Sequence, residues 1–226
     1  MPEFLLEKAL VLSVRRLGER SWILSLFSRG QGRISGVYQK KQPPDIGTFI
    51  TGRWQARLAE QLGRFYIEEM TSYIVRYLDD RKRLTCISSL CALLTDFLPE
   101  RQSFGSLYDS ILSFLENLDE TSFLKKYVLL ERKLLTEIGF GLDMSSCAGG
   151  GDKNDLAYVS PKTGRAVSRE KGEPYHDRLL ILPKFLWKES EASGNDIQNG
   201  LILTGYFLKQ HSPKHTLPVT RQSLFS

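Results

Sequence analysis

Residues 123–147 read FLKKYVLLERKLLTEIGFGLDMSSC, and the first half of this stretch is the strongest helical pattern in the chain. Its apolar side chains recur every three or four residues, which predicts a helix with a broad buried stripe. Thr121 is a candidate N-cap, and Gly139 is a candidate left-handed residue at the helix end. A stripe this broad is typical of a helix surrounded by others. We therefore expect residues 121–138 to form the central helix of a helical domain.

Apolar spacing predicts four more helices around this central one, at residues 81–98, 103–118, 177–186 and 196–210. Residues 156–168 follow the central helix and precede the helix predicted at residues 177–186. Their pattern predicts a β-hairpin with a proline-initiated turn. The tail from residue 211 to 226 contains Pro213 and Pro218. We expect this tail to be extended or loosely ordered.

The first 72 residues carry a strand pattern instead. Short apolar alternations separated by glycine-rich turns predict five strands, at residues 9–14, 21–27, 33–38, 48–58 and 63–70. Five short strands fit a small barrel of the OB type, although a simple five-stranded meander fits the periodicity too. The predicted fold is therefore α+β. An N-terminal five-stranded OB-type β-barrel (residues 1–72) precedes a helical domain (residues 73–226) with a small hairpin insertion at about residues 148–173.

The charge is unevenly distributed along the chain, whose formal net charge is +5. Residues 10–64 contain ten Lys or Arg and three Asp or Glu, a net +7, whereas residues 65–150 contain nine and thirteen, a net −4. A basic N-terminal module indicates a polyanion-binding face. Without a run of 18 apolar residues or an export signal, we expect no membrane partner. The three cysteines predict reduced thiols in a cytosolic protein.

Basic and aromatic residues alternate in the N-terminal module, a pattern that suits single-stranded nucleic acid, because cations track the phosphates while flat side chains stack on bases. On one predicted strand, Arg53 and Arg57 share a face opposite Trp54. We interpret Trp54 as a core residue and the arginines as nucleic-acid-binding residues. The alternative is that the arginines only form a solvated face of the barrel. The predicted nucleic-acid-binding residues are Arg15, Arg16, Arg20, Arg33, Lys40, Lys41, Arg53 and Arg57.

No motif in the sequence indicates catalysis, a metal or a cofactor. Cys147 lacks a CxxC partner, and Pro213 breaks any helix that would align His211 with His215. The three histidines form no recognisable catalytic triad, and the glycine-rich stretch 149–151 is not followed by the GK[ST] of a phosphate-binding loop. We expect no enzyme and no metal.

Three segments in order resemble the RecO family, the recombination mediators of bacterial DNA repair. The opening LVLSVRRLGERSWILSLFSRGQGRISG (residues 10–36) is similar to the family's R-x-x-G-E and F-[ST]-x-x-x-G-R strands. LLTEIGFGLDMSSCA (residues 134–148) is similar to its L-G-[FY]-G-[LV]-[DN]-x-x-x-C-A motif. AYVSPKTGRAVSREKGEP (residues 157–174) is similar to the hairpin that follows.

The resemblance implies an OB-fold, a helical domain and a zinc-ribbon-like insertion. It implies that the protein binds single- and double-stranded DNA, anneals complementary strands and helps load RecA on DNA coated with single-stranded-DNA-binding protein. The implied partners are RecR, possibly RecF, and the acidic C-terminal tail of single-stranded-DNA-binding protein, in the cytoplasm near the nucleoid. Zinc-binding members use four cysteines in the insertion, whereas this chain keeps only Cys147 there. We therefore expect a hairpin without zinc.

The resemblance implies that the eight basic residues predicted above to bind nucleic acid are the DNA-binding residues. The acidic tail of single-stranded-DNA-binding protein needs cations beside an apolar groove. Four cations flank the apolar stripe of the central helix and are candidates for docking this tail. The alternative interpretation is that they only form a solvated face of the helix. These candidates are Lys125, Lys126, Arg132 and Lys133. Two other functions fit the sequence, an RNA-binding OB-fold chaperone and a non-catalytic peptide-binding adaptor.

Overall fold

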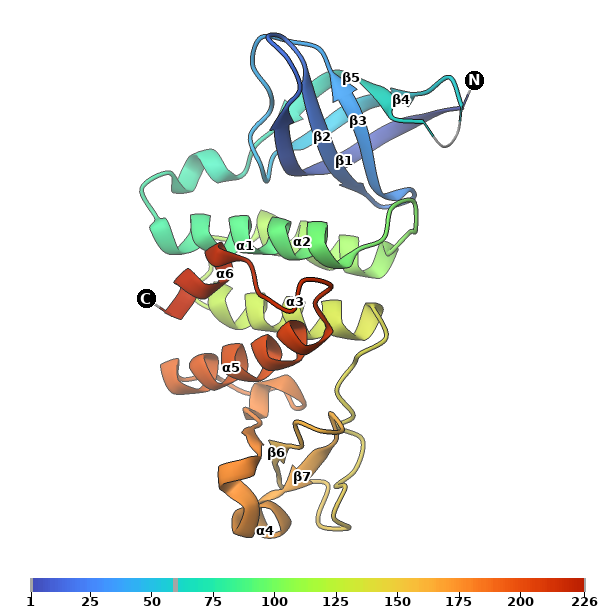
Figure 1. Cartoon of the computed structure of the whole chain (residues 1–226). Coiled ribbons are helices and arrows are strands. Elements are labelled where there is room, and N and C mark those ends of the chain that lie inside the picture. Colours follow the sequence, from blue (N-terminus) through green and yellow to red (C-terminus); the bar gives the residue numbers. More distant parts are fainter. Residues whose placement is uncertain (1, 59–60, 226) are drawn as a thin grey trace. The chain divides into compact units, whose positions relative to one another are not determined.

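The computed structural model describes residues 2–58 and 61–225 (Figure 1). The chain divides into two compact units. The first contains residues up to 116 together with Pro218–Leu224, and the second contains Asn117–Leu217. This division differs from the predicted domain boundary at residue 72, which lies where the sequence pattern changes from strands to helices. That boundary stays a prediction. The α+β class is confirmed, because a five-stranded sheet precedes the helices.

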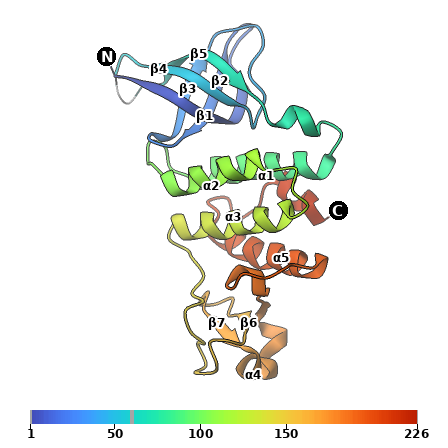
Figure 2. The same ribbon diagram turned by 180° about the vertical axis from the view of Figure 1, so that it is seen from behind.

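The five N-terminal strands close into a barrel in the order β1-β2-β3-β5-β4 (Figure 1, Figure 2). Neighbouring strands are antiparallel except β3 and β5, which run parallel and pair at only two positions, Gly36 with Gly63 and Val37 with Arg64. The first strand is longer than predicted because it pairs with β2 along one part and β4 along another. The strands are β1 (Glu3–Arg16), β2 (Trp22–Ser28), β3 (Gly32–Tyr38), β4 (Phe49–Gln55) and β5 (Gly63–Thr71).

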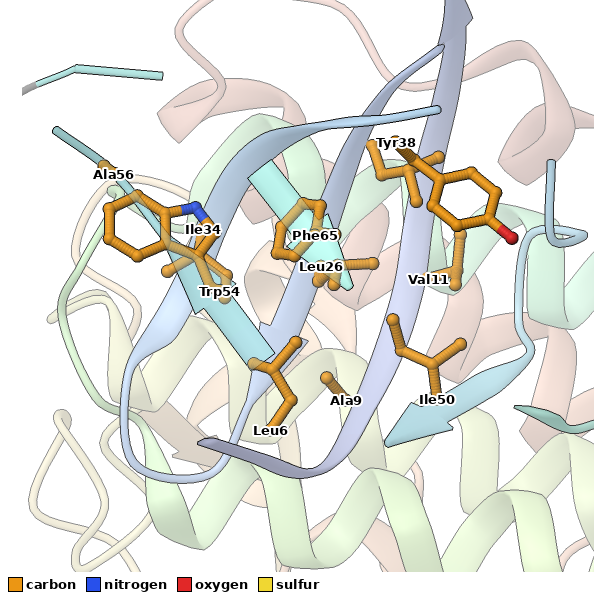
Figure 3. Close-up of a cluster of buried hydrophobic side chains, with 11 residues drawn as sticks. Leu6, Ala9, Val11, Leu26, Ile34, Tyr38, Ile50, Trp54, Ala56 and Phe65 are labelled. Carbon is orange, nitrogen blue, oxygen red and sulfur yellow. The ribbon is translucent and has the colours of Figure 1, made fainter. Parts of the chain in front are cut away.

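Alternating side chains of these strands fill the barrel with a single apolar cluster (Figure 3). Trp54 is the largest member and is only 1% exposed, which confirms its interpretation as a core residue. Its indole stacks on Phe4, with ring centroids 4.8 Å apart, and its Nε1–H donates to the carbonyl of Ser35 at 3.0 Å. The ring also occupies the space beside Gly63, where an added Cβ would lie 2.1 Å from an indole atom.

Helices α1 (Arg81–Phe97) and α2 (Gly105–Glu116) belong to the same unit as the barrel and lie close to their predicted positions. Tyr108 on α2 anchors to β1, since its hydroxyl donates to the Lys8 carbonyl at 2.7 Å. The Asp80 side chain caps α1 by accepting from the N–H of Arg83 at 3.0 Å. The 3-10 helix η1 (Ile74–Tyr77) connects β5 to α1.

The end of the chain is more ordered than predicted. Helix α6 (Val219–Gln222) and the 3-10 helix η4 (Ser223–Phe225) follow Pro218, and α6 packs on α1. The Arg221 side chain on α6 is 2% exposed. The prediction of a loosely ordered tail is therefore wrong for these residues, because Pro218 begins a short helix that is stabilised by a distant partner.

The second unit is built around α3 (Phe123–Glu137) and α5 (Gly194–His211). As predicted, Gly139 adopts a left-handed conformation (φ +89°) just after α3, although the N-cap is Ser122 instead of Thr121. The fully buried carboxylate of Glu131 on α3 accepts a hydrogen bond from Thr204 Oγ1 on α5 at 2.5 Å. A buried polar contact of this kind fixes the register of the two helices.

The predicted hairpin is confirmed, but it forms part of a three-stranded sheet in the order β7-β6-β8. The predicted helix over residues 177–186 is wrong: Leu180 and Ile181 form β8 and pair with Val159 and Tyr158. Pro183 then separates β8 from a 3-10 turn. The elements are β6 (Leu156–Val159), β7 (Ala166–Ser168), α4 (Arg169–Gly172), η2 (Glu173–Arg178), β8 (Leu180–Ile181) and η3 (Lys184–Leu186).

None of the helices in the described part of the chain has the length and apolarity needed to cross a membrane.

The close approach of Trp54 to Gly63 leads to a prediction about stability. Gly63→Ala would place a methyl group against the indole, and overpacking of this kind costs about 1–3 kcal/mol. We expect a lower urea midpoint for this variant. Gly18→Ala is the matched control, because an added Cβ at Gly18 meets no atom within 4 Å. Equal midpoints for the two variants would show that the barrel does not depend on this packing.

Candidate nucleic-acid interface

A row of outward-facing residues crosses four strands of the barrel. Arg15 on β1 pairs with Ile23 on β2, which pairs with Val37 on β3, which in turn pairs with Arg64 on β5. Neighbouring strands lie about 4.8 Å apart, so the two arginines are separated by roughly 14 Å across two partly exposed aliphatic side chains. The row therefore has an arginine at each end and the two aliphatic side chains between them. This arrangement suits single-stranded nucleic acid, in which phosphates alternate with bases.

The β1–β2 turn (residues 17–21) and the start of the β3–β4 linker (residues 39–48) lie at the same end of the barrel as this row. Trp22 joins them, because it pairs with Arg16 on β1 and its Nε1–H donates to the Lys40 carbonyl at 3.1 Å. The Arg16 guanidinium lies 5.8 Å from the centre of the Trp22 ring, within cation–π distance.

Five predicted residues therefore gather here, and we name them the turn cluster: Arg15, Arg16, Arg20, Lys40 and Lys41. All five are exposed. Within the residues that the structure describes, none of them takes part in an ion pair with N···O within 4.0 Å. Glu19 is the one acid in the β1–β2 turn. A cluster of exposed cations with so few acids attracts phosphate groups from solution.

The predicted pair Arg53 and Arg57 does not share one strand face. The fourth strand ends at Gln55, so Arg57 lies in the β4–β5 loop, and the predicted alignment of the two side chains is wrong. Arg53 is on the outer face of β4, opposite the buried Trp54 as predicted. Its guanidinium lies 5.1 Å from the centre of the Tyr66 ring and 3.5 Å from the Glu3 carboxylate.

Arg33 contacts the loop after α1. Its Nε–H donates to the Leu98 carbonyl at 2.7 Å, and its Nη1 lies 3.3 Å from the Glu100 carboxylate. The side chain is 20% exposed. These contacts tie β3 to the helices of the first unit, so we do not carry Arg33 into the interface.

Sequence reasoning left two exposed arginines out of the predicted site. Arg64 lies at the end of the row on β5, and strand alternation alone could have placed it there, since its neighbours Gly63 and Phe65 are buried. Arg101 lies in the loop between α1 and α2, and its guanidinium covers the Trp54 ring at 5.1 Å. Only the tertiary structure brings Arg101 to the barrel, so no local signal could have identified it.

In the second unit, three of the four cations proposed for tail docking make defined contacts within the unit. Lys125 donates to the Ser190 carbonyl at 2.8 Å, and Lys126 pairs with the Glu120 carboxylate at 2.6 Å. Arg132 donates to the Leu186 carbonyl, and its burial lowers the pKa of the guanidinium. Lys133 is half-buried. Lys125 and Arg132 therefore hold the segment after β8 against α3.

Cys147 is a buried thiol beside β7. The Ser168 N–H donates to its Sγ at 3.2 Å. Burial raises the pKa of Cys147, but hydrogen bonds from Ser168 and from the backbone N–H groups of Gly151 and Gly149 outweigh it and lower the pKa to about 7. No group of three or more His, Cys, Asp or Glu that could hold a metal ion occurs among residues 2–58 and 61–225.

The pKa of Cys147 predicts its reactivity. Because the thiolate is the nucleophile, alkylation of Cys147 by iodoacetamide should rise with pH around a midpoint near 7, whereas an ordinary cysteine has a midpoint near about 8.5. Peptide mass spectrometry measures this midpoint, with Cys91 as an internal control because burial raises its pKa to about 12. Ser168→Ala should move the midpoint upward. A midpoint of about 8.5 in the unchanged protein would contradict this interpretation of the hydrogen bonds.

Comparison with known proteins places these observations in a family. The model of the family described as "Recombination protein O C terminal" matches residues 78–220. Several curated relatives carry the description "DNA repair protein RecO". The relative from Rhodospirillum centenum is 43% identical over 213 residues, which cover 91% of this chain and 85% of the relative.

The relative from Rhodospirillum rubrum is 39% identical over 233 residues, covering 96% of this chain and 92% of its own length. The relative from Bartonella quintana is 40% identical over 215 residues, which cover 91% of this chain and 88% of the relative. With identities of this size over nearly the whole of both chains, this protein belongs to the RecO family of DNA repair proteins.

Proposed function

We propose that this chain is a non-catalytic mediator of homologous recombination in DNA repair. It binds single- and double-stranded DNA on its barrel, anneals complementary strands and helps load RecA on DNA coated with single-stranded-DNA-binding protein. The observation that carries the proposal is the turn cluster, five exposed cations at one end of a five-stranded barrel. The description of the relatives as DNA repair proteins supports the same process.

The barrel has the features of an OB-fold. OB-folds bind oligonucleotides on the face of strands 2 and 3 and with the loops that join strands 1 to 2 and 4 to 5. The row from Arg15 to Arg64 crosses β2 and β3, and the two loops carry Arg20 and Arg57. The parallel pairing of β3 with β5 brings the start of β5, and with it the end of the β4–β5 loop, beside the end of β3.

Annealing follows from charge neutralisation alone. Two DNA strands repel each other through their phosphates, and cations bound to both strands reduce this repulsion before base pairing begins. Each phosphate contact also releases condensed counterions, which favours binding at low salt. The protein therefore speeds pairing without forming or breaking a covalent bond.

The partners in this proposal are RecR, possibly RecF, and the acidic tail of single-stranded-DNA-binding protein, with the protein acting in the cytoplasm near the nucleoid. The tail would dock beside α3. The four candidates there are Lys125, Lys126, Arg132 and Lys133, of which Lys125 and Arg132 donate to backbone carbonyls of their own unit and Lys126 pairs with Glu120. The hairpin in the second unit would correspond to the zinc-ribbon-like insertion, held here by contacts such as that between Cys147 and Ser168.

The turn cluster can be tested by removing its charges. The double variant Arg20→Ala, Lys40→Ala should bind single-stranded DNA more weakly, and the slope of log affinity against log salt should fall by about 0.7 for each phosphate that the variant no longer neutralises. Fluorescence anisotropy with an oligothymidylate over a range of salt concentrations measures both quantities. Lys153→Ala, Arg178→Ala is the matched control, since both residues are exposed in the second unit. An unchanged slope in the cluster variant would contradict the assignment.

The mediator role can be tested by annealing complementary single strands that are already coated with their binding protein. We expect this chain to anneal strands coated with the intact binding protein, and to fail when the binding protein lacks its acidic tail, because docking is then abolished. A fluorophore and a quencher on the two strands report the rate. Failure with both forms would contradict the mediator role, and equal rates with both would contradict docking on the tail.

A further inference from the structure

We propose that Tyr66, on the outer face of β5, is a stacking platform for one unpaired base of single-stranded nucleic acid. This inference rests on the proposed binding of DNA by the barrel and deepens it, because it assigns a residue that distinguishes single strands from duplex. An aromatic ring accepts any base, since every base has a flat π-face. Tyr66 is 38% exposed, whereas its strand neighbours Phe65 and Ile67 pack in the barrel core.

The Tyr66 ring belongs to a row of side chains that crosses three strands. Leu5 on β1 pairs with Arg53 on β4, and Arg53 pairs with Tyr66 on β5. The Arg53 guanidinium lies 5.1 Å from the centre of the Tyr66 ring, within cation–π distance, and its Nη1 lies 3.5 Å from the Glu3 carboxylate. These contacts hold the ring from the β4 side. A tyrosine held in this way loses little conformational entropy when a base stacks on it.

On the β3 side, Tyr66 lies past the end of the neighbouring strand. The parallel pair of β3 and β5 places Val37 level with Arg64. Continued along both strands, this register puts Tyr66 one position beyond Tyr38, where β3 ends. Arg53 approaches the ring from β4, so the side toward β3 is where a base can reach the ring.

The platform continues the row that runs from Arg15 to Arg64. Tyr66 follows Arg64 by two residues on the same outer face of β5, about 7 Å further along the strand. A cation followed by a ring matches the alternation of phosphate and base in single-stranded nucleic acid. Beyond Tyr66, the exposed acids Glu68 and Glu69 repel phosphates. The nucleic-acid path along β5 therefore ends at Tyr66.

The other class of ligand for this row is a protein partner. Leu5 is 76% exposed and would be the main apolar contact beside Tyr66. Two apolar side chains are a small patch compared with a specific protein interface, which buries about 800 Å² on each partner, and single exposed apolar residues are normal on soluble proteins. The position of Tyr66 directly after Arg64 therefore favours a base.

Stacking and phosphate contacts respond differently to salt, which makes the test specific. Tyr66→Leu removes the ring, so we expect it to bind an oligothymidylate at least about fivefold more weakly, with an unchanged salt slope. Tyr66→Phe keeps the ring and should keep the affinity. Both variants should bind an oligomer of abasic residues, and duplex DNA, as the unchanged protein does. Fluorescence anisotropy measures these affinities, and Tyr175→Leu is the matched control, since Tyr175 is 60% exposed in the second unit.

The outcomes separate this inference from the proposed function. If Tyr66→Leu binds the oligothymidylate as tightly as the unchanged protein, or loses the same factor for the abasic oligomer, no base stacks on Tyr66 and this inference is wrong. If the unchanged protein binds no DNA at low salt, the proposed function itself fails.

Urea denaturation of the same samples reports whether Tyr66→Leu keeps its fold. If that variant unfolds, photo-cross-linking of the unchanged protein to an oligomer that contains 5-iodouracil decides, because this base cross-links to an aromatic ring stacked on it. We expect a cross-linked peptide that contains Tyr66, and cross-links that leave Tyr66 unmodified would overturn the inference.

Discussion

The first unit depends on the way Trp54 closes the barrel. The strands β3 and β5 pair at only two positions, so the sheet alone would leave β3 poorly joined to β5. The Trp54 indole spans this place with a hydrogen bond to the Ser35 carbonyl, while Phe4 stacks on its ring. The closure is possible because Gly63 has no side chain where the indole lies. It also sets the start of β5 beside β3, where Arg64 pairs with Val37.

Two groups of cations in the first unit differ in their surroundings. One group joins the barrel to the helices: Lys8 pairs with Glu116 at 3.0 Å, Arg29 with Asp109 at 2.9 Å, and Arg33 with Glu100 at 3.3 Å. The other group, the turn cluster, lies exposed at the end of the barrel. Exposed ion pairs contribute little stability each, whereas a cluster of cations with few acids nearby creates a field that draws in phosphates. The presence or absence of an acidic partner therefore distinguishes the cations that join the barrel to the helices from those that we propose bind DNA.

The sequence predicted the fold well where the signal is local. Strand alternation placed all five strands, and apolar spacing placed α1, α2, α3 and α5, because each element buries one face. The failures involve distant partners. Residues 180–181 pair as a strand with β6, and α6 folds against α1, neither of which a short window can reveal. The end of β4 at Gln55, which separates Arg53 from Arg57, was missed for the same reason.

The candidate site was predictable in composition but not in detail. The excess of basic residues in the N-terminal module indicated that the candidate site lies on the barrel, and the turn cluster lies on the barrel. Sequence could not show that Arg33 donates to the Leu98 carbonyl or that Lys125 donates to the Ser190 carbonyl, because the acceptors are backbone atoms 65 positions away in each case. Nor could it show that the loop carrying Arg101 reaches Trp54.

The most direct test of the central claim, that DNA binds to the end of the barrel that carries the turn cluster, is to map where DNA touches the chain. Ultraviolet cross-linking of the protein to an oligothymidylate, followed by mass spectrometry of the peptides, identifies the contact residues. Our account predicts cross-links within residues 15–41, which include the partly exposed Trp22, together with peptides around the β4–β5 loop. Cross-links confined to residues 117–217 would contradict it.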